Sequence, residues 1–82
     1  MMEDEVRKLL EPFRDKYEII SCGSCDDYLK DGLYAELKAT FPIVITSTSV
    51  SYGSAVINIH KPYVSVVKGF GNDILHALSL IR

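Results

Sequence analysis

The sequence predicts a single α+β domain over residues 1–82, with one mixed sheet covered by helices in the order α-β-α-β-β-β-α. Two observations predict this class. Apolar residues recur at helical spacing in the first half of the chain and again near its end. Between them, residues 43–60 carry no charged side chain, and nine of these eighteen residues are Val, Ile or Thr, a composition typical of strands.

The first half of the chain predicts two helices separated by a short strand. The first helix spans roughly residues 3–16, with a break at Pro12, which lacks a backbone donor. Residues 18–21 form the strand. The second helix spans about residues 26–40 and ends before Pro42, although Gly32 within it costs roughly 1 kcal/mol relative to alanine. Its apolar stripe consists of Leu29, Leu33, Leu37 and Phe41.

The second half predicts three strands and a final helix. The strands lie near residues 43–50, 55–60 and 63–68, because turn residues at 52–54 and at Lys61-Pro62 separate them. Apolar residues at helical spacing predict the last helix over about 72–81, with Asn72 as its N-cap.

Composition and charge exclude several classes of protein. The net charge of −2 and the lack of a basic patch with exposed aromatic residues argue against a nucleic-acid partner. The charged start MMEDEVRK is not typical of a signal peptide, and no apolar run is long enough for a membrane span, so we expect a cytoplasmic protein. In a reducing compartment, two cysteines are more often free thiols, a metal pair or a catalytic pair than a structural bridge.

The segment SCGSCDD, residues 21–27, is the strongest candidate site. A helix that begins beside Cys25 would lower thiol pKa values, so Cys22 could attack a disulfide and Cys25 could resolve the mixed intermediate, without any cofactor or metal. The substrate would be a protein thiol or disulfide. Alternatively, Ser24 and Asp27 form a capping box and the cysteines only pack, because the neighbouring aspartates would raise a thiol pKa.

The stretches CGSCDDYLKDGLYAELKATFP and GSAVINIHKPYVSVVKGFG resemble the cysteine loop, first helix and hairpin of the selenoprotein W and selenoprotein T (Rdx) group. The resemblance implies a thioredoxin-like portion over residues 18–82, after an N-terminal helix at 1–17, with Cys22 and Cys25 as its redox site. Three features depart from that pattern. The helix precedes the first strand, the segment between the second helix and the hairpin is short, and Ala55 stands where thioredoxins have a cis-proline.

Other sites are less well supported by the sequence. A zinc site made of Cys22, Cys25, His60 and His76 is disfavoured by the spacing of the histidines. Residues 68–73 lack the third glycine and the βαβ setting of a dinucleotide-binding loop, so they predict a flexible turn.

Two functions remain open at this point. One is a small thiol-disulfide oxidoreductase. The other is a non-catalytic α+β interaction module or homodimeric assembly subunit that associates through its sheet, because an uncharged edge strand within residues 43–60 invites pairing with another chain.

Overall fold

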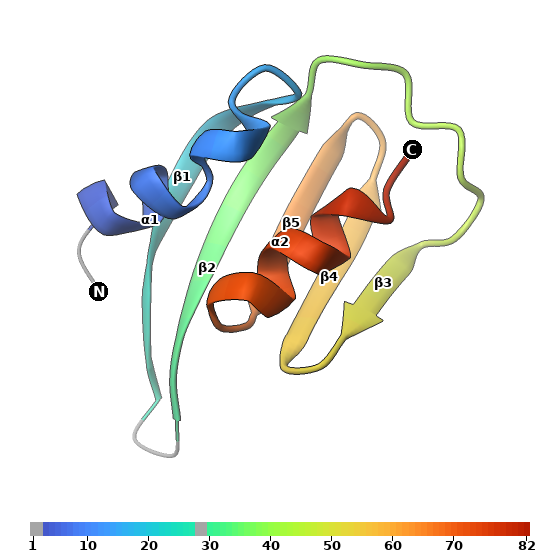
Figure 1. Ribbon diagram of the computed structural model, residues 1–82. Coiled ribbons are helices and arrows are strands. Elements are labelled where there is room, and N and C mark those ends of the chain that lie inside the picture. The colour runs from blue at the N-terminus through green and yellow to red at the C-terminus, as the bar shows by residue number, and fades with distance from the viewer. Residues whose placement is uncertain (1–2, 28–29) are drawn as a thin grey trace.

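The computed structural model describes residues 3–27 and 30–82, and it contains one five-stranded antiparallel sheet with two short helices on the same face (Figure 1). Helix α1 and a single 3₁₀ turn, η1, come first; five strands follow, and helix α2 comes last. The elements are α1 (Glu3–Leu9), η1 (Glu11–Phe13), β1 (Tyr17–Asp27), β2 (Lys30–Ala39), β3 (Ser49–Tyr52), β4 (Ala55–His60), β5 (Tyr63–Lys68) and α2 (Gly71–Ser79). The strand order in the sheet is β1-β2-β5-β4-β3.

The predicted fold class is wrong. The sheet is antiparallel in all four pairings of the described strands, rather than mixed, and the predicted second helix is replaced by strand. The helix that a thioredoxin-like portion over residues 18–82 requires after its first strand is therefore missing from the described residues. The thioredoxin-like fold that the resemblance implied is therefore also wrong.

Residues 30–39 form strand β2 because their apolar residues also alternate with polar ones. Leu33, Ala35, Leu37 and Ala39 are buried, whereas Tyr34 and Lys38 are exposed and Glu36 is half-buried. Residues four apart share a face in a helix and also in a strand, so the spacing of Leu29, Leu33 and Leu37 fits both structures. Pairing with β1 on one side and β5 on the other selects the strand.

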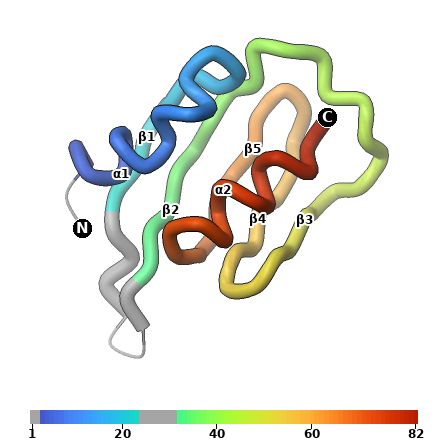
Figure 2. The backbone as a smooth tube through the Cα atoms, viewed as in Figure 1, coloured from blue at the N-terminus to red at the C-terminus, as the bar shows by residue number. Residues whose placement is uncertain are grey.

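The predicted strand over 43–50 is mostly an extended connection. It carries the chain from β2, near one edge, across the end of the sheet to β3 at the opposite edge, as the tube in Figure 2 shows. Only its last residues, from Ser49, pair with a neighbouring strand. The N–H groups of Val44 and Ile45 donate to the carbonyl oxygen of Arg82 at 2.8 and 2.7 Å, which ties the connection to the C-terminal end.

Several local predictions are confirmed. The first helix breaks before Pro12, which lies in η1, and strands β4 and β5 have the expected bounds, with turns at Gly53-Ser54 and at Lys61-Pro62, whose peptide bond is cis. The final helix begins earlier than expected. Its N-cap is Phe70, which makes no side-chain capping bond, so the predicted cap at Asn72 is wrong.

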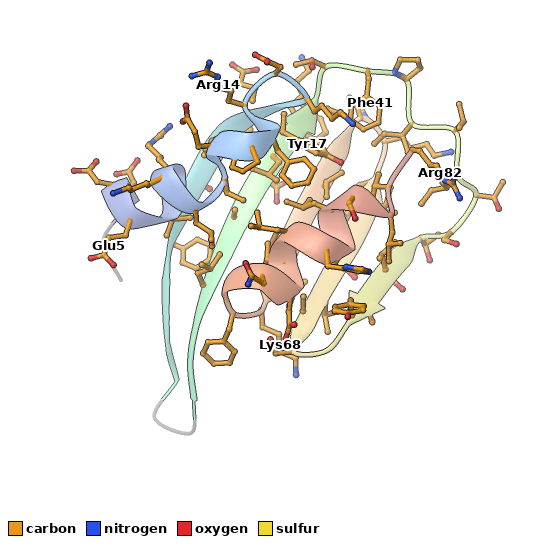
Figure 3. All side chains as sticks on the ribbon, in the orientation of Figure 1. Glu5, Arg14, Tyr17, Phe41, Lys68 and Arg82 are labelled. Atoms are coloured by element: carbon orange, nitrogen blue, oxygen red, sulfur yellow. The ribbon has the colours of Figure 1, made fainter. Side chains whose placement is uncertain are left out.

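The core lies between the helices and the inner face of the sheet. Val6 from α1, and Ile74 and Leu78 from α2, pack onto the buried residues of β2, β4 and β5. At one end of this core, Tyr17 contacts Phe41 edge-on with ring centroids 5.4 Å apart, as the labelled side chains of Figure 3 show. Burial raises the pKa of Tyr17 to about 12.

Candidate functional site

Both predicted redox cysteines lie in strand β1, and no helix begins beside them. The prediction that they stand at a helix N-terminus is therefore wrong, and so is the capping box at Ser24. Three residues of extended strand separate the two α-carbons by about 10 Å. A disulfide needs α-carbons within about 7 Å. The side chain of Cys25 lies outside the described part of the structure.

Cys22 is half-buried beneath α1 and packs against the core. Its Sγ lies 4.0 Å from the carbonyl oxygen of Glu3. Burial raises the pKa of the Cys22 thiol; the Arg7 guanidinium opposes this rise and the Glu3 carboxylate adds to it. A raised pKa leaves less thiolate at neutral pH, which is the opposite of what an attacking cysteine needs.

Strand β3 forms one of the two edges of the sheet. Ile59 N–H donates to the carbonyl oxygen of Thr48 at 2.8 Å, which places the pair Thr48/Ile59 among the hydrogen-bonded pairs. Bonded and non-bonded pairs alternate along an antiparallel ladder, so Val50 and Tyr52 also direct their backbone groups toward β4. The N–H and C=O groups of Ser49 and Ser51 therefore point outward, away from every described strand.

The side chains of β3 give this edge little protection. The strand is SVSY, without charge, proline or bulge, and it follows a connection that is also uncharged from Ile43 onward. Charged residues, proline and bulges are the devices that usually prevent an edge strand from pairing with another chain. Shortness, at four residues, is the one common safeguard that β3 has.

The opposite edge, β1, has the protection that β3 lacks. Its register shifts between Ile19 and Ser21, which indicates a bulge, and α1 packs against it. Its sequence also places the charged residue Glu18 near the start of the strand. The two edges of the sheet therefore differ in their capacity to pair.

An apolar flank lies beside β3 on the helix side of the sheet. The ring of Tyr52 stacks on His76 of α2, with centroids 3.8 Å apart and an interplanar angle of 23°. Leu80 is four residues beyond His76, and the Arg82 carbonyl then binds the backbone of Val44. Three exposed apolar side chains belong to these segments, and we call them the β3 flank: Val44 (70% exposed), Tyr52 (44%) and Leu80 (44%).

The turn after β3 is braced by Asp73. One carboxylate oxygen of Asp73 accepts hydrogen bonds from the Ser54 backbone N–H at 2.9 Å and from its hydroxyl at 2.8 Å. The Ser54 hydroxyl oxygen in turn accepts from the backbone N–H of Phe70 at 3.1 Å. These bonds lower the pKa of the Asp73 carboxyl, Ser54 contributing most, and they hold the β3–β4 hairpin against the start of α2.

The alternative metal site includes Cys25, whose side chain lies outside the described part of the structure. Among the side chains that the structure describes, no three of His, Cys, Asp or Glu gather around one point. His60 ends β4, whereas His76 stacks on Tyr52 in α2. The segment predicted as a flexible turn, residues 68–73, joins β5 to α2, and its Asp73 is bound to Ser54.

The sequence pointed to residues 43–60 as a candidate edge but did not identify the strand or its brace. The absence of charge was the useful signal, and β3 does lie at an edge. Nothing in the sequence identified Asp73 as the partner of Ser54, because the two residues are nineteen positions apart and meet only when α2 packs on the hairpin.

Comparison with known proteins gives no relative: no family model, curated protein or solved structure matches the chain. Among the helices of the described residues, none has the length and apolar character needed to cross a membrane.

Proposed function

We propose that this protein is a non-catalytic antiparallel-sheet module that self-associates through the outer edge of β3. The observation that carries the proposal is the outer edge itself. It has outward-directed backbone groups at Ser49 and Ser51, and no charged side chain from Ile43 to His60 that would disfavour pairing.

Simple energetics give the expected strength of this association. Four backbone hydrogen bonds across the edge contribute about 0.5–1.5 kcal/mol each. Association itself costs about 4–15 kcal/mol in lost freedom of the two chains. The bonds alone do not balance that cost, so burial of the β3 flank has to supply the rest. We therefore expect a weak dimer, populated at micromolar concentrations or above.

The test is the molar mass in solution, measured by size-exclusion chromatography with light scattering over a series of concentrations. The unmodified chain should approach twice the monomer mass as its concentration rises. Ser51→Lys should remain monomeric, because a lysine on the outer edge opposes strand pairing. Ser51 is exposed, so the substitution leaves the core untouched.

Ser21→Lys is the matched control. It places the same charge at an exposed strand position on the other edge of the sheet, and it should dimerise like the unmodified chain. A chain that stays monomeric at every concentration would contradict the proposal. So would an equal loss of association in the two lysine variants.

Thiol–disulfide exchange by Cys22 and Cys25 stays a prediction from the sequence. Its support is the pair itself, and it would require β1 to depart from extended geometry so that the two sulfurs meet. A redox titration in glutathione buffers, with free thiols trapped by alkylation and counted by mass, tests it. Two thiols that titrate independently would contradict thiol–disulfide exchange by this pair.

A further inference from the structure

The outward-directed groups of β3 are arranged symmetrically about one residue, Val50. We infer that the partner on this edge is a second copy of the chain, paired antiparallel with β3 about a two-fold axis that passes through Val50. The inference rests on the proposed self-association and adds its symmetry and register.

Symmetry about Val50 satisfies all of the outward backbone groups at once. An axis at this residue places Ser49 opposite Ser51 of the partner subunit, and Ser51 opposite Ser49 of the partner subunit. In an antiparallel ladder, two opposed residues whose groups face each other exchange both N–H···O bonds. Two such pairs give four bonds, which uses the N–H and the C=O of both serines in each chain.

The neighbouring registers are less favourable. If the axis passed between two residues, a residue whose backbone groups point toward β4 would lie opposite one whose groups point outward. The buried faces of the two copies would then lie on opposite sides of the joint sheet. An axis on Ser51 would place Ser49 opposite Gly53, in the hairpin turn. An axis on Ser49 would place Ser51 opposite Ser47, which lies beyond the bend of the chain at Thr48. Only the Val50 axis opposes Ser49, Val50 and Ser51 to the same three residues of the partner subunit, which leaves Tyr52 opposite Thr48 at the bend.

The side chains of β3 suit a contact of the strand with itself. In a two-fold interface the residue on the axis meets its own copy, and the residues beside the axis meet each other's copies, so a charge near the axis would lie close to its own copy and be repelled. Val50 is half-buried on the helix side and would meet Val50 of the partner subunit, whereas serines would meet serines on the other face. The product is a continuous ten-stranded sheet with all four helices on one face, and with the β3 flank of each copy beside the junction.

Cross-linking through introduced cysteines tests the register. Val50→Cys, Ser49→Cys and Ser51→Cys are each made in a Cys22→Ser/Cys25→Ser chain, and the purified full-length proteins are oxidised with diamide, which takes up two hydrogens as two thiols form one disulfide. Each substitution lies on the axis of one of the three registers. Only a residue on the axis faces itself at disulfide distance, whereas its neighbours face themselves diagonally, about 7–8 Å apart.

We expect Val50→Cys to form the covalent dimer at least about tenfold faster than either serine variant, because only its β-carbons meet within reach. Faster cross-linking of Ser49→Cys or Ser51→Cys would overturn the Val50 register and leave self-association through β3 intact. If none cross-links above the cysteine-free parent while the mass in solution is doubled, β3 is not the interface. A monomeric mass at every concentration would overturn the proposed function together with the register.

Amide hydrogen exchange on the unmodified chain decides the question if a cysteine variant fails to fold. Dilution should speed exchange at Ser49 and Ser51, whose N–H groups are bonded only in the dimer, and should leave Val50, bonded within its own chain, unchanged. Exchange at the two serines that does not respond to dilution would overturn the inference.

Discussion

At the scale of single residues, the Asp73 carboxylate links the β3–β4 turn to α2 through two hydrogen bonds from Ser54. Because these bonds favour the charged form, the pKa of Asp73 is lower in the folded chain than in the unfolded one, where it is about 3.9. The stabilisation is therefore fully present above the unfolded-state pKa. It is lost as the pH falls through the lower, folded-state value.

We expect Asp73→Asn to lower the melting temperature at pH 7, and the difference from the unmodified chain to shrink as the pH falls below about 4. Thermal unfolding followed by circular dichroism at several pH values measures this. Asp15→Asn, which removes an exposed carboxylate from the other end of the sheet, should show little difference at any pH. A pH-independent difference for Asp73→Asn would show that charge is not what stabilises the turn.

At the scale of elements, the β3–β4 hairpin depends on a glycine. Gly53 has φ of +55°, followed by a residue with negative φ, which fits a two-residue type II′ turn. A β-carbon at Gly53 would lie 2.6 Å from a carboxylate oxygen of Asp73. A larger residue at this position would strain the backbone and would also push the Asp73 carboxylate away from Ser54.

We expect Gly53→Ala to cost about 2–4 kcal/mol of the free energy of unfolding, the sum of a left-handed non-glycine residue and a displaced hydrogen-bonded side chain. Gly71→Ala is the matched control: its φ is also positive, at +36°, but a β-carbon there meets nothing within 4 Å. It should cost only about 1 kcal/mol. Urea unfolding of both variants measures the loss of unfolding free energy. Equal losses would mean that the Asp73 side chain moves away from a new β-carbon at no cost in stability.

At the scale of the whole molecule, one core joins the sheet to both helices, and α2 supplies its central side chain, Ile74, which is fully buried. We expect Ile74→Ala to cost about 2–5 kcal/mol, because the cavity adds to the lost burial. That is a large share of the roughly 5–15 kcal/mol that stabilises a small domain.

Val67→Ala removes apolar atoms from an exposed site on β5 and should stay within about 0.5 kcal/mol of the unmodified chain. Both variants need to be unfolded in denaturant at one protein concentration, since dimerisation adds a concentration-dependent contribution to stability. A similar cost for the two substitutions would contradict the assignment of Ile74 to the core.

The elements predicted correctly from the sequence are those whose signals are local. The break before Pro12 and the turns at Gly53-Ser54 and Lys61-Pro62 follow from the backbone preferences of a few adjacent residues. Strand β4 lies between these two turns and strand β5 begins directly after the second, so the turns located both strands. The uncharged composition of residues 43–60 made an edge strand there a hypothesis, and of the two strands in this segment β3 lies at an edge and β4 inside the sheet.

Only the tertiary structure decided the state of residues 26–40 and the position of each strand in the sheet. Leucines spaced four apart fit a helix face and a strand face equally well, and pairing with β1 and β5 made the choice. That choice placed Cys22 and Cys25 in a strand, so the predicted helix-based thiol site lost its structural basis. The edge position of β3 likewise depends on which strands pair elsewhere, because edge and centre are properties of the assembled sheet and no short stretch of sequence encodes them.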